Sequence, residues 1–119
     1  MVVDLLAGEA LSDPEADLVF RALADATRRD ILARAIEHEQ SVSALARRSE
    51  MSLTAVQKHV AVLERAALVS KQKRGREQRV AANPETLRKA TTLLATFEQL
   101  WIKRATKMAE ILAEEGTGT

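Results

Sequence analysis

The chain has 119 residues, of which 46% are hydrophobic, so we expect a single domain (residues 1–119) with its own core rather than a disordered chain. It contains no cysteine, which excludes disulfides, thiolate metal sites and thiol catalysis and fits a reducing cytoplasm. No apolar run reaches the roughly 18 residues of a membrane-spanning helix, and the N-terminus lacks the basic region of a secretory signal. We therefore expect a cytoplasmic protein with no membrane partner.

The net charge of +1 hides an uneven distribution of acids and bases. Residues 1–27 carry six acids and one base (−5), residues 28–79 carry twelve bases and six acids (+6), and residues 80–119 carry five of each. A basic middle region favours a polyanionic partner such as nucleic acid. The alternative is ordinary variation among solvated helix faces.

The first part of the chain predicts three helices. A short one covers residues 4–10. A second runs from about 14 to 24, with Asp13 as its cap and Pro14 in its first position. A third begins after Asp25 as N-cap and ends near His38. Helical spacing predicts that the last two helices bury these apolar residues: Leu18, Val19, Ala22, Leu23, Ile31, Leu32, Ala35 and Ile36.

Two helical patterns that meet at a tight break predict a helix-turn-helix. Ser41 or Ser43 caps a short helix, residues 50–52 form the turn, and Ser52 caps a longer helix to about Ala67. The inward residues of the longer helix are Val56, Val60 and Leu63. Its outward polar residues on the first two turns are Thr54, Gln57 and Lys58, where a recognition helix meets the major groove.

A basic hairpin is expected next, with strands over residues 68–73 and 77–81 and a tip at 74–76. Gly75 supplies the positive φ that such a turn can require. Six bases and one acid fall between Arg65 and Arg79, so the hairpin charge must face solvent or a polyanion.

The chain ends in a long predicted helix that Asn83 caps and Pro84 opens, and that runs to about Glu114. Its apolar residues recur at the heptad spacing of a coiled coil and are Leu87, Ala90, Leu94, Phe97, Trp101, Met108 and Ile111, with Arg104 as an interruption. Because a small domain rarely buries so long a stripe alone, we expect self-association. The alternative is that the stripe only covers the chain's own core.

These motifs, DATRRDIL, then VSALARRSEMSLTAVQKHVAVLERAALV, then KQKRGREQRVAANPETL, resemble the ArsR-type winged-helix repressors over roughly residues 18–112. The resemblance implies a mainly α fold with a small β-hairpin, in which 42–81 form the helix-turn-helix and wing. It further implies a homodimeric, sequence-specific transcriptional regulator, usually a repressor, that binds an imperfect palindrome in double-stranded DNA. The dimerisation helices would be 1–24 and 84–114, with the interface residues Leu5, Leu94, Phe97, Trp101 and Met108.

The sequence departs from the family pattern at two kinds of position. Many members sense metals through a cysteine pair before the recognition helix or through histidines on the last helix, and neither set is present here. We therefore expect no metal site and no cofactor. At Ala66-Ala67 the family often has a glycine, so the helix is expected to end with a less relaxed bend.

The residues expected to contact DNA are Ser52, Thr54, Gln57, Lys58, His59, Arg74, Arg76 and Arg79. Gln57 suits adenine, and Lys58 suits guanine or phosphate. His59 either packs at the helix junction or donates to a phosphate. No paired histidines and no glycine-rich phosphate loop occur, so we expect no enzyme. The alternative function is a protein-interaction module on a winged-helix scaffold. The operator sequence, the effector and the choice between repressor and activator are not encoded in these motifs.

Overall fold

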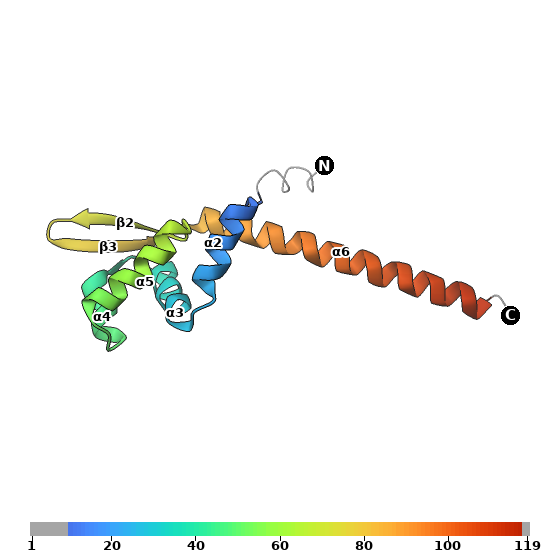
Figure 1. The fold of residues 1–119 in the computed structure, drawn as a ribbon, viewed down its shortest axis with the longest axis horizontal. Helices are drawn as coiled ribbons and strands as arrows, with labels where there is room; N and C mark the ends of the chain where they lie inside the picture. Colours follow the sequence, from blue (N-terminus) through green and yellow to red (C-terminus); the bar gives the residue numbers. More distant parts are fainter. Residues whose placement is uncertain (1–9, 118–119) are drawn as a thin grey trace.

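The computed structural model describes residues 10–117, and within that range it contains five helices and a three-stranded sheet (Figure 1). The helices are α2 (Asp13–Leu23), α3 (Ala26–Glu37), α4 (Val42–Arg48), α5 (Leu53–Arg65) and α6 (Pro84–Thr117). The strands are β1 (Gln40–Ser41), β2 (Val69–Arg74) and β3 (Glu77–Ala82). The expected fold class, mainly α with a small β-hairpin and a long C-terminal helix, is confirmed. The helix expected at 4–10, including Leu5, falls outside the described range apart from its last residue.

The cap of α2 differs from the prediction. Ser12, and not Asp13, is the N-cap: its Oγ accepts from the Glu15 backbone N–H (3.3 Å), while Glu15 Oε1 accepts from the Ser12 N–H (2.8 Å). This reciprocal capping box satisfies two backbone donors, whereas a cap at Asp13 would satisfy fewer. Asp13 instead lies in the first turn, where its charge suits the positive end of the helix dipole.

The core lies where α2, α3, α4 and α5 meet the sheet, and its largest fully buried side chains are Val19, Ile31, Leu45, Val56, Val60, Leu63, Leu68 and Val80. Two residues predicted to be buried are not. Leu18 is 41% exposed and Ile36 is 55% exposed. At 3.6 residues per turn, each of these two side chains lies about 90–100° from the centre of the buried face of its helix. Each therefore stays outside the contact when the neighbouring elements pack on that face.

The sheet has the order β1-β3-β2 and is antiparallel throughout. The predicted hairpin is present with its strands shifted by about one residue, and its tip is the two-residue loop Gly75-Arg76 between the paired residues Arg74 and Glu77. Gly75 has φ +63°, the left-handed conformation expected of it. Strand β1 was not predicted, because a strand of two residues is too short to show an alternation of apolar and polar residues. It pairs Ser41 with Arg79 and so joins the base of the wing to the start of α4.

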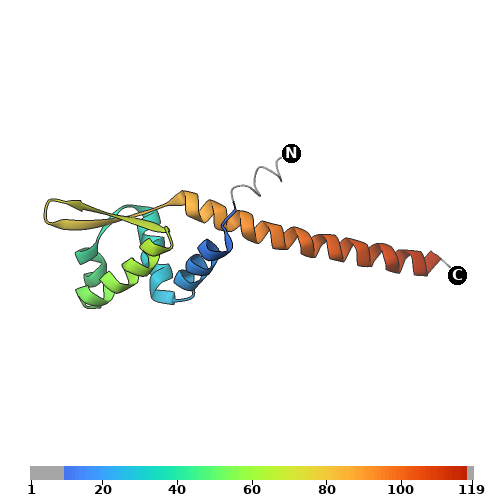
Figure 2. The same ribbon diagram turned by 45° about the horizontal axis from the view of Figure 1, so that its top comes forward.

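Helix α6 leaves the rest of the molecule and extends alone for most of its length (Figures 1 and 2). Asn83 caps it as predicted: its Oδ1 accepts from the Glu85 N–H (3.2 Å), and its Nδ2 donates to the Ala67 carbonyl (3.0 Å). The first turns pack on the core through Leu87, Ala90 and Leu93. No helix in the described range is long and apolar enough to cross a membrane.

Candidate nucleic-acid interface

The turn between α4 and α5 is built by a helix-ending motif with an unusual residue. Glu50 has φ +53°, and the Met51 N–H donates to the Ala46 carbonyl five residues earlier (3.2 Å). That bond is the outer bond of a Schellman motif, which usually places glycine in the left-handed position. Met51 then packs against the core. The turn therefore has a defined geometry that sets the angle between the two helices.

Helix α5 begins at the N-cap Ser52, whose Oγ accepts from the Ala55 N–H (3.1 Å). Val56, Val60 and Leu63 are fully buried on one side of this helix. The opposite side presents Thr54, Gln57 and Lys58 to solvent, and the adjoining Leu53 is 47% exposed. We call these four side chains the α5 reading face. It carries a hydroxyl, an amide, an ammonium and an apolar group, which are the groups that recognise base edges in a major groove.

His59 lies away from this face, at the junction of α2, α3 and α5. Arg28 Nη1 is 3.4 Å from His59 Nδ1, and the same guanidinium donates to the carbonyls of Ala22 (2.8 Å) and Arg21 (3.0 Å). The Arg28 backbone N–H donates to Asp25 Oδ1 (3.0 Å) and holds the pKa of that carboxyl below its usual value. The structure therefore supports the packing alternative for His59, while its contact with phosphate stays a prediction.

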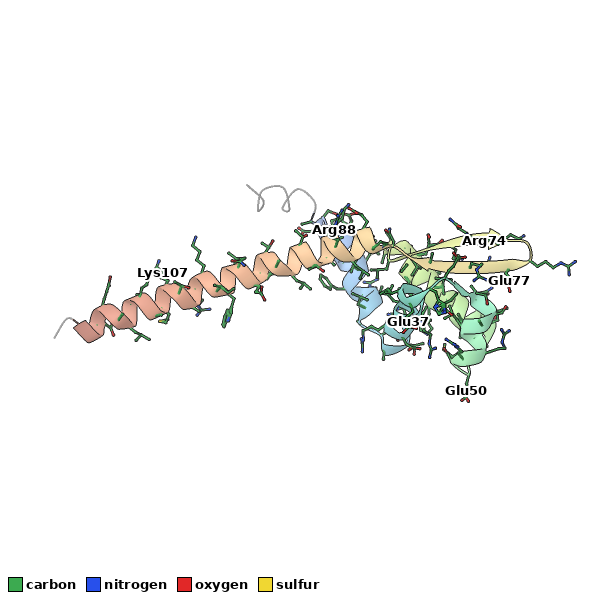
Figure 3. All side chains as sticks on the ribbon, turned by 180° about the vertical axis from the view of Figure 1, so that it is seen from behind. Glu37, Glu50, Arg74, Glu77, Arg88 and Lys107 are labelled. Carbon is green, nitrogen blue, oxygen red and sulfur yellow. The ribbon has the colours of Figure 1, made fainter. Side chains whose placement is uncertain are left out.

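The wing extends from the same side of the molecule as α4 (Figure 1), and Arg74 and Glu77 both lie on it (Figure 3). The arginines of the wing differ in their surroundings. Arg76 lies at the tip and has no ion-pair partner among residues 10–117. Arg79 is half-buried in the middle of β3, with Nε 2.7 Å from Glu39 Oε1 and Nη1 3.0 Å from Glu77 Oε2. These two hydrogen bonds, the Glu39 bond foremost, raise the pKa of Arg79. Arg74 is exposed, with Nη2 3.7 Å from the other Glu39 oxygen.

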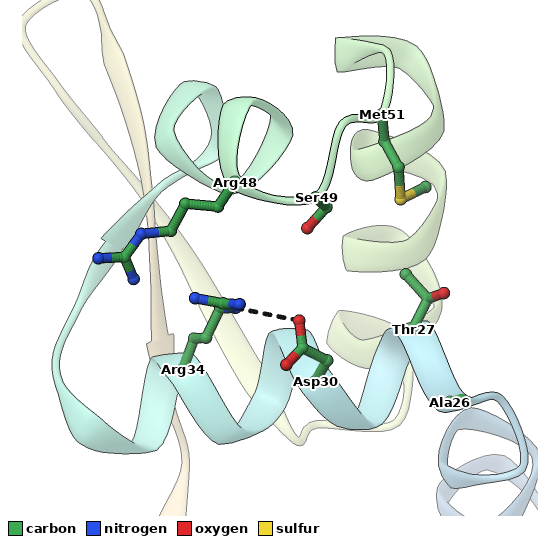
Figure 4. A pocket seen from close by; sticks show the side chains of 7 residues that line it. All are labelled: Ala26, Thr27, Asp30, Arg34, Arg48, Ser49 and Met51. Carbon is green, nitrogen blue, oxygen red and sulfur yellow. Dashed lines mark hydrogen bonds and ion pairs between the residues drawn. The ribbon is translucent and has the colours of Figure 1, made fainter.

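A hollow of about 290 Å³ lies between α3 and the α4–α5 turn (Figure 4). Arg34 and Asp30 form an ion pair at its edge (3.0 Å), and Ser49 Oγ is buried there without a hydrogen-bond partner. Arg48 also lines the hollow, and within the described range it has no ion pair. The charge of Arg34 is thus paired with that of Asp30, whereas Arg48, at the end of α4, has no acidic partner in that range.

Comparison with known proteins decides the family. The chain is 34% identical over 103 residues to the HTH-type transcriptional regulator Rv2034 of Mycobacterium tuberculosis (strain ATCC 25618 / H37Rv), covering 87% of this chain and 94% of that protein. An ArsR-like transcriptional regulator from Rhodococcus sp. RHA1 is 36% identical with a TM-score of 0.74, over 82% of this chain and 92% of that one. The ArsR family transcriptional regulator RHA00566 is 33% identical with a TM-score of 0.72, over 77% and 95%. No family model matches. The chain belongs to the ArsR family of transcriptional regulators.

The winged helix-turn-helix fold of this ArsR-family chain is shared with more distant structures. The homodimeric winged helix-turn-helix DNA-binding domain Mb0332 from Mycobacterium bovis is 24% identical with a TM-score of 0.60, over 76% of this chain and 88% of that one. As a regulator of this family, the chain is a DNA-binding protein and not an enzyme.

The described part of the chain contains no cluster of metal-binding side chains. The sequence has no cysteine and two histidines. Within residues 10–117, no three His, Asp or Glu side chains gather where they could hold a metal ion. His59 lies against Arg28, and His38 Nδ1 lies 3.4 Å from the Gln40 amide nitrogen.

The structure brings most of the predicted DNA-contact residues to two neighbouring elements. Thr54, Gln57 and Lys58 share the reading face of α5, and Arg74 and Arg76 lie on the exposed part of the wing. One contact of the wing was not predicted: Glu39 accepts a hydrogen bond from Arg79, 40 residues away. No spacing rule links such distant positions, so only its negative charge in a basic region could have drawn attention to it.

Proposed function

We propose that this ArsR-family chain is a homodimeric repressor that binds an imperfect palindrome in double-stranded DNA, acts in the cytoplasm and takes no metal as its signal. The observation that carries the proposal is the division of α5 into two sides. Val56, Val60 and Leu63 are fully buried on one side, so the helix cannot rotate without exposing them. The polar reading face is thereby held outward, as insertion into a major groove requires.

The contacts with DNA divide into those that read bases and those that hold the backbone. Gln57 can form two hydrogen bonds with adenine, and Lys58 can donate to guanine or phosphate. Ser52 begins α5, and the free N–H groups of a helix start favour a phosphate nearby. On the wing, Arg74, Arg76 and Arg79 are proposed to contact phosphates or the minor groove.

Dimerisation is proposed to use the distal part of α6. Leu94, Phe97 and Met108 are exposed, and Trp101 is 67% exposed. These side chains continue the same helix face that Ala90 buries against the core, so the apolar stripe runs on beyond the domain. The M. bovis protein of the same fold is described as homodimeric, which supports the same assembly here.

Two substitutions test the DNA contacts by separating affinity from sequence preference. Gln57→Ala should reduce discrimination at one base pair by about 1–3 kcal/mol, because a bidentate contact is lost. Arg76→Ala should weaken binding to all duplexes alike and reduce the slope of log affinity against log salt by about 0.9, because one phosphate is then no longer bound. Binding would be measured on sequences selected from a random duplex pool.

Matched controls lie on α6, away from the proposed interface. Gln99→Ala removes the same amide, and Lys103→Ala removes a positive charge; both residues are exposed on the polar side of α6. These controls should bind like the wild type. If Gln57→Ala and Arg76→Ala kept wild-type affinity and base preference, the assignment of the reading face and wing would be wrong. A reporter gene that is activated, rather than silenced, through the selected sequence would contradict the repressor role.

A further inference from the structure

Glu39 connects two arginines of the wing to the body of the molecule. It lies in the short segment between α3 and β1, and its Oε1 accepts from Arg79 Nε at 2.7 Å. Its Oε2 lies 3.7 Å from Arg74 Nη2. Its backbone carbonyl also accepts from Arg79 Nη2 (3.5 Å). One residue therefore engages Arg79 twice and Arg74 once.

The segment that carries Glu39 is held in place from both sides. Gln40 is only 6% exposed, and its Nε2 donates to the carbonyls of Arg34 (3.1 Å) and His38 (3.0 Å) at the end of α3. Ser41 caps α4 through its Oγ (3.0 Å to the Ala44 N–H) and pairs with Arg79 in the sheet. Glu39 is thus fixed between the helix-turn-helix and the wing, and its carboxylate faces the wing.

A carboxylate in this position competes with DNA phosphate for the same guanidinium groups. Arg79 forms hydrogen bonds to the Glu39 carboxylate with Nε, to Glu77 with Nη1 and to the Glu39 carbonyl with Nη2, so all three of its nitrogens are engaged before DNA arrives. Arg74 keeps 63% of its side chain exposed, but its charge is partly balanced. Arg76 at the tip pairs with no acid in the described part of the chain. The wing therefore offers phosphate less positive charge than its sequence suggests.

We propose that Glu39 is a positioning and specificity-determining residue of the DNA interface: it holds the wing against the body and limits how strongly Arg74 and Arg79 bind phosphate. The inference rests on the proposed function as a DNA-binding regulator. Phosphate contacts supply sequence-independent affinity, and base contacts supply discrimination. By restraining two phosphate-binding arginines, Glu39 lowers nonspecific affinity and leaves the α5 reading face a larger share of the binding free energy.

The test is the salt dependence of binding by Glu39→Gln, a change that keeps the shape of the side chain and removes its charge. Nonspecific duplex binding should tighten by about eightfold at about 0.1 M salt for each additional phosphate that the released arginines bind. The slope of log affinity against log salt should steepen by about 0.9 for each such phosphate, up to two phosphates. Binding to the selected sequence should tighten less, so the specificity ratio should fall.

The matched control is Glu37→Gln, which removes the same charge two positions away. Glu37 is exposed at the end of α3, and no ion pair involves it within the described range (Figure 3). It should leave the slope and the specificity ratio unchanged. The double variant Glu39→Gln/Arg79→Ala should lose most of the added affinity, because the released guanidinium is then absent.

The outcomes separate this inference from the proposed function. Equal slopes for the wild type, Glu39→Gln and Glu37→Gln would overturn the role of Glu39 while leaving DNA binding intact. The same steepening in both single variants would show a long-range charge effect and would also overturn it. A Glu39→Gln chain that melts earlier but keeps the wild-type slope, measured well below its melting temperature, would reduce Glu39 to a structural role. Absence of duplex binding by the wild type at low salt would overturn the proposed function itself.

Discussion

At the scale of single residues, two positions accept backbone conformations that favour glycine. Ala67 has φ +59° and Glu50 has φ +53°, and each ends a helix of the DNA-binding unit. After α5, the Ala67 N–H donates to the Glu64 carbonyl (2.9 Å) and the Leu68 N–H donates to the Leu63 carbonyl (3.0 Å). These are the two backbone hydrogen bonds of a Schellman motif. The Ala67 carbonyl then accepts from Thr86 Oγ1 (2.6 Å), so this bend also positions the start of α6. The expected less relaxed bend is therefore an alanine in a left-handed conformation.

Replacing this alanine with glycine should stabilise the fold. A side chain in the left-handed region costs the folded state about 1–2 kcal/mol, and glycine removes this cost. Glycine also gives the unfolded chain more freedom, which offsets about 0.4–1 kcal/mol of the gain. We expect Ala67→Gly to raise the free energy of unfolding by about 0.5–1 kcal/mol, measured as a higher urea midpoint with an unchanged m-value. The adjacent Ala66, buried with φ −79°, is the control: Ala66→Gly should destabilise by about 1 kcal/mol. Equal effects of the two changes would contradict this explanation.

At the scale of elements, α6 has two parts with different surroundings. Its first turns are stabilised by the core through Leu87 and Ala90, and by the Asn83 and Thr86 contacts with Ala67. From Leu94 onward it exposes apolar side chains over many turns. This distal part is held by the backbone hydrogen bonds of the helix itself. An isolated helix of this kind is marginal in water, because most helical stability in proteins comes from packing an apolar face. We therefore propose that the distal part packs against the same helix of a second copy.

A charge placed on the apolar side of α6 should separate the two copies. Phe97→Glu should weaken dimerisation at least about a hundredfold, because each dimer would bury two carboxylates in place of two aromatic rings. Sedimentation velocity over a dilution series would measure the change. Gln99→Glu, which adds the same charge on the polar side of α6, should sediment like the wild type. Identical sedimentation of the two variants would place the interface elsewhere.

At the scale of the whole molecule, the wing and the distal end of α6 lie at opposite ends of an elongated molecule (Figure 2). The described chain measures 76 × 31 × 24 Å with a radius of gyration of 20.2 Å, whereas a compact domain of this length would have about 13–14 Å. The proposed DNA-reading surface and the proposed dimer surface are therefore separate. In a symmetric dimer, the helices that join the copies would set the distance between the two α5 reading faces.

This geometry predicts a fixed spacing between half-sites. Two reading faces held by one rigid dimer should meet half-sites about one helical turn, or about 34–36 Å, apart. Inserting about 5 base pairs between the half-sites rotates one of them to the opposite side of the duplex. Affinity should then fall at least about tenfold, toward that of a single half-site, in a fluorescence anisotropy titration. A spacer of altered sequence but unchanged length is the control, and full affinity for the inserted operator would contradict a rigid dimer.

Sequence alone was sufficient for the elements whose signals act over a few residues. The caps at Asp25, Ser52 and Asn83 and the buried row Val56, Val60 and Leu63 were all predictable, because a cap acts within three residues and a helix face repeats every three or four. The outward position of Thr54, Gln57 and Lys58 follows from the same periodicity. The contacts of these residues with DNA stay predictions.

The folded arrangement was needed to show which distant residues meet. The Glu39–Arg79 ion pair joins positions 40 residues apart, and the Arg28–His59 contact joins positions 31 apart. Strand β1 exists only because β3 lies beside it, and the exposure of Ile36 depends on how its neighbours dock. Such contacts depend on the relative placement of whole elements, which no local pattern encodes. For this reason the sequence indicated only a basic wing, and the fold shows that an acid from the body pairs with two of its arginines.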